Sequence, residues 1–330
     1  MVKMRFAEIF GDCYSTRSLT LEKQLGCTDV IGHGPITGSE VWEYSDLVEL
    51  RKRVEGFGLR IDTLEDGPSI DKIMLGLPER GEQLENFCRS LENLGRAGIR
   101  TIKPQHMPPG WEKIMTTSES PTRGGAATRT FDYEVAKKTP PTKYGVISEE
   151  QTWSNLKYFL KGALPTAESA GVRISLHPDD PPISPIQGFA RVLRSVEAFD
   201  RMLEIYPSPN IGLLFCQGCF AEMGADIPAT IRHFGKRGKI FFAHFRDVEG
   251  AVPRFQEVFH GEGSTDMFEA MKAYYDVGFD GPIRPDHAPK MEGDELYLEG
   301  KQGYYLLGKV YALGYMRGLA ESVEKTYKYS

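Results

Sequence analysis

The chain has 330 residues, of which 40% are hydrophobic, and a formal net charge of −6. This length and apolar content suffice for a large buried core, as one α/β barrel or as two smaller domains. Basic residues are spread along an acidic chain, which argues against a nucleic-acid partner. No apolar run approaches the roughly 18 residues that a bilayer-spanning helix needs, so we expect no membrane partner.

Cysteine usage and the amino-terminal segment indicate a cytoplasmic protein. The chain contains five cysteines, an odd number without the spacing of a disulfide framework. The opening MVKMRFAEIFGD has charged residues too early for the apolar region of a signal peptide. A reducing cytoplasm is therefore the expected location.

Eight short apolar runs along the chain are typical of buried strands. They are residues 6–10, 29–32, 59–64, 99–103, 172–176, 211–215, 239–243 and 282–284. Most are followed by segments whose apolar residues recur every three or four positions, the periodicity of an amphipathic helix. One clear example is carried by Leu84, Phe87 and Leu91. A final helix is expected from about Tyr305 to Tyr327.

Alternating strands and helices predict a (β/α)8 TIM barrel, because eight parallel strands are the number that closes this barrel. An open, doubly wound sheet is the alternative. The sequence shows no internal repeat and no domain linker. Residues 1–330 are therefore expected to form a single domain.

Residues 105–148 depart from this alternation, because they are rich in Pro, Thr, Ser and Gly and largely lack periodicity. Loops of this length are usually functional or disordered. The segment follows the fourth strand, so it would lie over the mouth of the barrel. We interpret it as a substrate lid; the alternative is a surface insertion without a role in the site.

Four consecutive strands end in side chains that can bind a metal ion. His177 follows the fifth strand and Cys216 the sixth. His244 follows the seventh, and Asp286 lies just beyond the eighth. The ends of neighbouring barrel strands lie side by side, so these four residues are expected to meet. Two imidazoles, a thiolate and a carboxylate suit Mn, Fe, Co or Zn rather than Mg or Ca.

Charged residues beside these strand ends could complete such a site. Asp179, Asp180 and Asp247 are candidate acceptors for the N–H groups of ligating imidazoles. Arg246 and Arg284 could bind a substrate carboxylate through paired hydrogen bonds. The alternative for the two arginines is ion pairing with these same acids.

Cys216 and Cys219 also form a C-x-x-C pair in CQGC. A redox motif would need a thioredoxin-like context, and a zinc knuckle would need a second cysteine pair; the sequence has neither. Cys219 is therefore interpreted as a packing residue. His33 and His106 follow other strands closely enough to reach the barrel mouth.

Several segments of the chain resemble the signature segments of D-mannonate dehydratases. They are ISLHPDDPP (174–182), LLFCQGC (213–219), IFFAHFRDV (240–248), FQEVFH (255–260) and GPIRPDH (281–287). The similarity is densest between Glu149 and His287, and it is recognisable upstream in segments such as IMLGLPER (73–80). Motifs of this length are far more specific than a lone glycine fingerprint.

The resemblance implies a TIM barrel of the xylose-isomerase-like kind that carries a Mn(II) or Fe(II) ion. The family removes water from D-mannonate to give 2-keto-3-deoxy-D-gluconate, in hexuronate catabolism. Its metal ligands fall on the four strand-end residues named above. Its catalytic histidine falls on His287 and its catalytic tyrosine on Tyr304. These two residues are then expected to share the general acid and general base roles.

The chain departs from the family in the segments expected to contact the substrate. After the fourth strand, KPQHMPPGWEKI (103–114) replaces a C-Y-N-F-M-P pattern followed by D-W-T-R-T, and AEIFG (7–11) replaces an R-W-Y-G opening. Pro104 and Gln105 replace the tyrosine and the asparagine, and Lys113 the arginine. The candidate substrate-binding residues are His106, Lys113, Arg246 and Arg284.

Two other classes of protein stay open. One is a related TIM-barrel lyase, isomerase or epimerase that acts on another aldonic acid or keto-sugar. Isomerases of this kind usually assemble Glu, Asp and His ligands, so Cys216 argues against them. The other class is a metal- or sugar-binding protein without turnover. Barrels of this kind often pair, so under any of these interpretations we expect the chain to form a homodimer.

Overall fold

A computed structural model describes residues 3–35, 39–107, 114–296 and 304–329. Eight parallel strands close into a barrel in the order β1-β12-β9-β8-β7-β4-β3-β2. The barrel strands are β1 (Arg5–Glu8), β2 (Asp29–His33), β3 (Arg60–Asp66), β4 (Thr101–Ile102), β7 (Arg173–Leu176), β8 (Ile211–Cys216), β9 (Ile240–His244) and β12 (Pro282–Arg284). Each overlaps a predicted run. The TIM barrel is therefore confirmed, and the open sheet is excluded.

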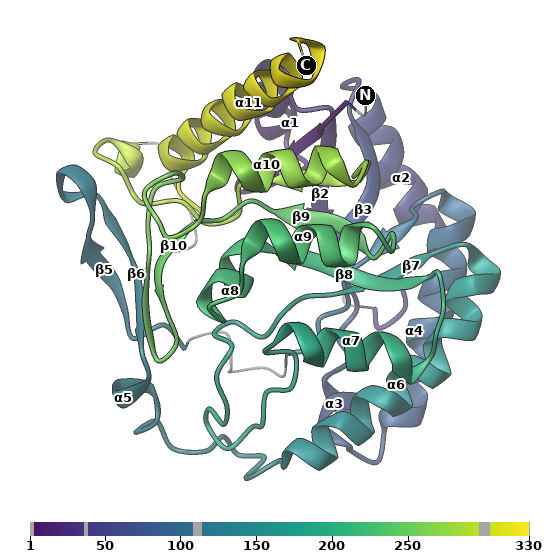
Figure 1. Ribbon diagram of the computed structural model, residues 1–330. Coiled ribbons are helices and arrows are strands. Elements are labelled where there is room, and N and C mark those ends of the chain that lie inside the picture. Colours follow the sequence, from purple (N-terminus) through teal and green to yellow (C-terminus); the bar gives the residue numbers. More distant parts are fainter. Residues whose placement is uncertain (1–2, 36–38, 108–113, 297–303, 330) are drawn as a thin grey trace.

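Helices surround the barrel (Figure 1). They are α1 (Thr16–Gln24), α2 (Tyr44–Glu55), α3 (Asp71–Leu75), α4 (Arg80–Ala97), α5 (Tyr133–Ala136), α6 (Glu149–Ala170), α7 (Val196–Ile205), α8 (Gln217–Glu222), α9 (Ile227–Gly235), α10 (Met267–Asp276) and α11 (Leu306–Tyr329), with short 3-10 turns at Arg123–Gly125 and Asp294–Leu296. Helix α6 begins after Ser148, whose side chain accepts the N–H of Gln151, and ends at a left-handed Gly171. None of the described helices has the length and apolar character needed to cross a bilayer.

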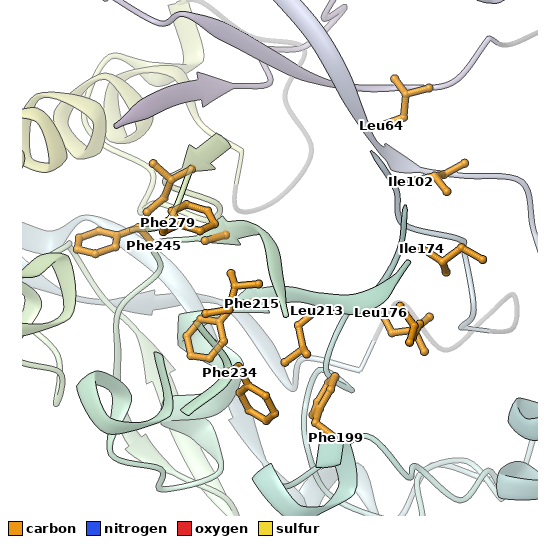
Figure 2. Close-up of a cluster of buried hydrophobic side chains, with 14 of the residues drawn as sticks. Leu64, Ile102, Ile174, Leu176, Phe199, Leu213, Phe215, Phe234, Phe245 and Phe279 are labelled. Carbon is orange, nitrogen blue, oxygen red and sulfur yellow. The ribbon is translucent and has the colours of Figure 1, made fainter. Parts of the chain in front are cut away.

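Aromatic side chains pack between the strands and the helices outside them (Figure 2). Phe215 of β8 stacks on Phe220 of α8 with ring centroids 4.6 Å apart. Phe199 of α7 lies 5.3 Å from Phe220, and Phe234 of α9 lies 6.1 Å from it. All four rings are fully buried. This packing holds the strands whose ends carry the candidate metal ligands.

A second sheet lies beside the barrel and was not predicted from the sequence. Its four strands, in the order β10-β11-β6-β5, are antiparallel. They are β5 (Thr117–Pro121), β6 (Ala127–Asp132), β10 (Val248–Ala251) and β11 (Arg254–Glu257). Two of them come from the insertion at 105–148, and Figure 1 shows β5 and β6 on the side of the barrel where β10 lies. Phe131 and Phe255 stack between β6 and β11 with centroids 5.5 Å apart.

Three charged side chains are fully buried close to one another: Glu8 of β1, Glu22 of α1 and Lys309 of α11. Nζ of Lys309 lies 2.8 Å from a carboxylate oxygen of Glu8. Neither oxygen of Glu22 has a hydrogen-bond partner among the described residues. Burial, followed by repulsion from Glu8, raises the pKa of Glu22 to about 9.

This raised pKa predicts a pH-dependent loss of stability. Between the unfolded-state pKa of about 4.3 and the folded-state value, the native protein binds a proton that the unfolded chain has released, so stability falls as pH rises. Glu22→Gln replaces the titrating carboxyl with a neutral amide and should raise the free energy of unfolding by about 5 kcal/mol near pH 8, and by progressively less toward pH 5. Denaturant unfolding at several pH values measures the effect.

Glu49→Gln, on the exposed side of α2, is the matched control and should leave the free energy of unfolding unchanged at every pH. A gain from Glu22→Gln that does not vary with pH would contradict this assignment.

Candidate active site

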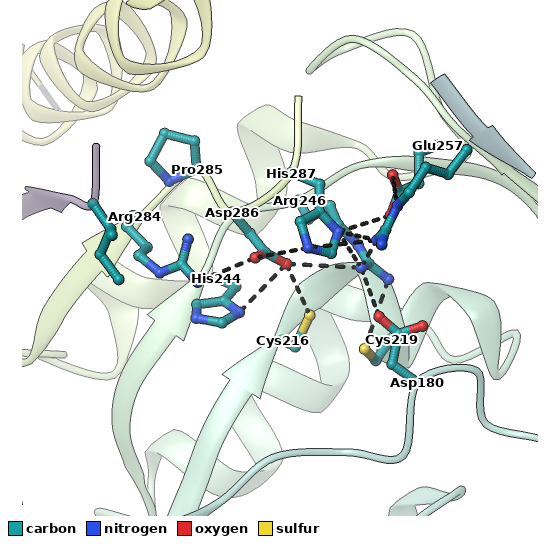
Figure 3. A network of polar contacts seen from close by, with 12 residues as sticks. Asp180, Cys216, Cys219, His244, Arg246, Glu257, Arg284, Pro285, Asp286 and His287 are labelled. Carbon is teal, nitrogen blue, oxygen red and sulfur yellow. Dashed lines mark hydrogen bonds and ion pairs between the residues drawn. The ribbon is translucent and has the colours of Figure 1, made fainter. Parts of the chain in front are cut away.

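Strand order brings four metal-competent side chains together at the barrel mouth. His177 directly follows β7, while Cys216 and His244 are the last residues of β8 and β9. Asp286 lies two residues beyond β12, in a left-handed conformation with φ of 70°. These four strands are consecutive neighbours in the barrel, and Cys216 pairs directly with His244. Figure 3 shows Cys216, His244 and Asp286 facing one another.

The distances within this cluster suit a common ligand. One ligand-capable atom from each of Cys216, His244 and Asp286 lies within 4.8 Å of the other two, and the same holds for His177, Cys216 and Cys219. The rings of His177 and His244 have centroids 5.5 Å apart. Sγ of Cys216 lies 3.7 Å from Oδ2 of Asp286. The two groups share Cys216, and together they include a side chain from each of the four strand ends.

The two imidazoles are oriented as metal ligands usually are. Nδ1 of His177 lies 2.6 Å from the carbonyl oxygen of Pro178, which leaves Nε2 available. Nε2 of His244 lies 3.2 Å from a carboxylate oxygen of Glu65. Nδ1 of His244 is buried without a hydrogen-bond partner in the described chain, and Asp286 Oδ2 is 3.4 Å away. Ligating histidines typically bond one nitrogen to such an acceptor and offer the other to the metal.

The surroundings of Cys216 favour its thiolate. Burial by itself raises the pKa of this thiol, but the Cys219 S–H and the Arg246 guanidinium outweigh burial and hold the pKa well below the usual thiol range. Cys219 is buried in a small hydrophobic cluster, and its Sγ also lies 3.7 Å from Nη2 of Arg246. A thiolate is the form in which cysteine binds metal ions.

Carboxylates around His244 compete for its proton. Burial and the Arg284 cation lower the pKa of His244, but Asp286 and Glu65 outweigh them and raise it to about 10. Burial opposes ionisation of Asp286, yet its electrostatic interactions with His244, His287 and Arg284 hold its pKa well below the usual range. The proton on His244 balances the charge of these carboxylates in the absence of metal. A metal ion bound here would balance it instead.

The two arginines predicted to bind substrate are buried and ion-paired. Arg284 donates to both oxygens of Glu65 at 2.8 and 2.9 Å and to Asp286 at 3.2 Å. Arg246 donates to Asp180 at 2.9 Å and also contacts Glu222. The pairing with Asp180 is the alternative raised from the sequence, whereas Glu65 and Glu222 are partners that the sequence did not indicate.

The three aspartates expected to orient the imidazoles have other contacts in the structure. Asp179 accepts the backbone N–H of Leu193 at 2.8 Å. Asp247 accepts the N–H groups of Gly261 and Gly263, at 3.0 and 2.9 Å, and so ties down the chain after β11. Asp180 pairs with Arg246, as described above. His177 instead contacts a backbone carbonyl, and His244 contacts Glu65 and Asp286.

His287 and Tyr304 lie together at the edge of the cluster. Their rings meet edge to face with centroids 5.0 Å apart. Nδ1 of His287 lies 2.8 Å from Glu257, and its Nε2 lies 3.7 Å from Asp286. Burial and the charge of Asp286 raise the pKa of Tyr304 above its ordinary value, so the phenol keeps its proton at neutral pH.

His106 lies at the mouth beyond β4, and it is 5% exposed. Neither of its ring nitrogens has a hydrogen-bond partner among the residues that the structure describes. Burial, with repulsion from Lys103 and His177, lowers its pKa to about 3, which keeps the ring neutral. His33 bonds to Asp66 at 2.7 Å at the end of β2. Lys113 lies outside the described residues.

Four residues of this site were missed from the sequence: Glu65, Arg129, Glu222 and Glu257. Glu65 could have been found, because it lies at the carboxyl end of β3, where the strand-end argument applies equally. Glu257 lies in a signature segment, but its contact with His287 depends on how β11 folds. Arg129 comes from the aperiodic insertion, and no pattern in the sequence points to it.

A (β/α)8 barrel with His, Cys, His and Asp at neighbouring strand ends defines a class of TIM-barrel enzymes with a potential transition-metal centre. Comparison with known proteins narrows this class. The sequence profile of the D-mannonate dehydratase (UxuA) family matches residues 2–143 and 134–330. The chain belongs to the D-mannonate dehydratase family, and it is therefore an enzyme of the hydro-lyase type.

Individual relatives agree with the family. A mannonate dehydratase of Brachyspira hyodysenteriae is 34% identical over 325 residues, covering 88% of this chain and 89% of the relative. One from Thermotoga maritima is 31% identical, with 97% of each chain covered. The crystal structure of mannonate dehydratase from Streptococcus suis serotype 2 matches with a TM-score of 0.89 at 31% identity, over 99% of this chain and 95% of that one. An L-ribulose 3-epimerase, at 15% identity and a TM-score of 0.62, shares the fold.

Breaking the Glu65–Arg284 pair should destabilise the protein strongly. Glu65→Gln leaves the fully buried Arg284 without its main counter-charge, and loss of one partner of a buried pair costs about 3–5 kcal/mol. Denaturant unfolding with a chelator present measures the free energy of unfolding without any contribution from bound metal.

The matched control is Glu55→Gln, which removes an exposed ion pair with Arg51 on α2 and should cost less than about 0.5 kcal/mol. If both variants lost the same free energy of unfolding, the buried Glu65–Arg284 pair would contribute no more to stability than an exposed pair.

Proposed function

We propose that the protein dehydrates D-mannonate to 2-keto-3-deoxy-D-gluconate with a bound divalent metal ion. The observation that carries the proposal is the meeting of four strand ends around Cys216, in two ligand-competent groups that share this residue, beside the His287–Tyr304 pair. The names of the relatives supply the substrate. The donor set has a thiolate and two imidazoles, which fits Mn, Fe, Co or Zn rather than Mg or Ca. The family resemblance favours Mn(II) or Fe(II) among these ions.

Dehydration of an aldonic acid removes a proton from the carbon beside the carboxylate, and hydroxide leaves the next carbon. A divalent ion held by His177, Cys216, His244 and Asp286 would supply Lewis-acid stabilisation of the charge that develops on substrate oxygens. The remaining work is proton transfer by protein groups. We propose that His287 and Tyr304 divide the base and acid roles between them.

The contacts of these two residues support that division. Tyr304 keeps its phenolic proton in the resting protein, and cations lie near its ring: Arg284 at 5.7 Å and Lys309 at 4.6 Å from the centroid. His287 is held at Nδ1, so Nε2 lies on the side of Asp286. An acid and a base on adjoining positions can serve one substrate without any large rearrangement.

Substrate binding is proposed for four residues. His106 offers a neutral ring with two unbonded nitrogens, which suits hydroxyl groups of a sugar acid. Arg246 and Arg284 are already engaged by carboxylates, so we propose that they attract the anionic substrate mainly through their charge. Lys113 is kept as a candidate on its position in the sequence.

Two further proposals concern the setting of the enzyme. A cytoplasmic location is supported by five free cysteines, because disulfides are rare in that compartment. The lid function of residues 105–148 is supported by Arg129, which extends from this segment to His287. Pairing into a homodimer stays a prediction that sedimentation would test.

The direct test is an assay of the Mn-loaded protein with a panel of aldonic acids, followed by detection of 2-keto-3-deoxy product. We expect product from D-mannonate. Product only from other acids would point to a related lyase of different specificity. If no acid yields product, interconversion of keto-sugars would indicate an isomerase or epimerase, and metal binding alone would indicate a non-catalytic protein.

Proton transfer by His287 and Tyr304 gives a sharper prediction. His287→Gln and Tyr304→Phe should each lower kcat at least about 100-fold, the usual contribution of a positioned acid or base. Bound metal, measured by elemental analysis, should stay at the wild-type level because neither residue is a proposed ligand.

Controls of the same residue type lie on helices outside the proposed site. His233→Gln on α9 and Tyr275→Phe on α10 remove contacts with Asp200 and Glu324, respectively, and should keep full activity. Full activity in Tyr304→Phe would remove that tyrosine from the mechanism.

A further inference from the structure

Two strands of the second sheet extend polar side chains to His287. Glu257 is the last residue of β11, and one of its oxygens lies 2.8 Å from Nδ1 of His287. Arg129 of β6 donates to both oxygens of Glu257, from Nε at 2.8 Å and from Nη2 at 2.6 Å. Two guanidinium groups also lie at Nδ1 of His287: that of Arg129, through Nη2, and that of Arg246, whose Nη1 is 3.0 Å away and 3.3 Å from Glu257. The second sheet therefore meets the proposed catalytic residue directly.

The strand register makes this arrangement specific. Thr130 pairs with Gln256 across β6 and β11, so Arg129 and Glu257 face each other at the next position of the antiparallel ladder. Their side chains are 15% and 4% exposed, so the ion pair is shielded from water. Figure 3 shows Glu257 beside His287 and Arg246. A buried bidentate pair of this kind has a well-defined geometry.

We propose that Glu257 is a positioning residue for His287, and that Arg129 is a positioning residue for Glu257. The inference rests on the proposed function for the role of His287 as a proton carrier. Glu257 accepts the Nδ1–H of His287, which fixes the ring orientation and the tautomer, and leaves Nε2 for proton transfer. The insertion at 105–148 thus contributes a residue that the reaction needs.

Other roles for Arg129 fit the contacts less well. Its Nε and Nη2 are both bonded to Glu257, which leaves mainly Nη1 for a substrate. As a purely structural pair it would not need His287, yet both members contact that ring. An ion pair with only structural contacts exists on the same two strands: Arg254 lies 4.0 Å from Asp132, and its side chain is 75% exposed.

Steady-state kinetics separate these roles. Glu257→Gln should lower kcat about 30- to 100-fold, and Arg129→Ala about 10-fold, with KM changed less than about threefold. The double variant should be no more than about threefold slower than Glu257→Gln alone, because Arg129 acts through Glu257. Guanidinium in the assay should partly restore Arg129→Ala. Arg254→Ala is the matched control and should keep wild-type kcat.

A second measurement needs no substrate. In protein with ¹⁵N-labelled histidine, the signals of His287 are identified among seven histidines by their loss in His287→Gln. The wild-type, metal-free protein should carry a proton on Nδ1 of His287. Glu257→Gln should shift this ring toward a mixture of tautomers, while Arg254→Ala should leave it unchanged. This spectrum decides the question even if D-mannonate proves not to be the substrate.

The outcomes are distinct. A rise in KM for Arg129→Ala, with losses that multiply in the double variant, would make Arg129 a substrate ligand and overturn the proposal. An unprotonated Nδ1 in the wild type would overturn the role of Glu257. If Glu257→Gln fails to fold, Arg129→Ala retains Glu257 and can still be studied both by kinetics and by the histidine spectrum. Failure of the proposed function would appear separately, as a wild-type enzyme inactive on D-mannonate with an intact histidine spectrum.

Discussion

Charges removed from water need partners of opposite sign, and this requirement organises the barrel mouth. Arg246 and Arg284 are fully buried there, and each lies among carboxylates supplied by other segments of the chain. The same carboxylates orient the histidines: Glu65 bonds His244, and Glu257 bonds His287. Charge neutralisation and site geometry are thus one network, in which each side chain stabilises and positions its neighbours.

Much of this architecture could be predicted from the sequence. Apolar runs followed by helical periodicity located all eight barrel strands, because burial on both faces leaves a continuous apolar signal. The convergence of His177, Cys216, His244 and Asp286 could be predicted for a topological reason. In a closed parallel barrel, consecutive strand ends are neighbours whatever the length of the chain between them.

The rest depends on three-dimensional contacts that a single sequence does not encode locally. The strands of the second sheet have few residues and carry polar side chains, so β5 and β6 resemble an aperiodic insertion. The choice of acid for each cation is also set by packing. Asp247, next to a ligand candidate in the sequence, bonds the backbone of Gly261 and Gly263, whereas Glu65 reaches His244 from the opposite half of the barrel.

The central claim is that one ion binds residues from four strand ends, with Cys216 among its ligands. X-ray absorption at the metal K-edge of the Mn- or Fe-loaded protein tests it most directly, because sulfur is distinguished from nitrogen and oxygen in the first coordination shell. We expect one sulfur scatterer in the wild type and in Cys219→Ser, and none in Cys216→Ser. A shell of nitrogen and oxygen alone in the wild type would contradict the account.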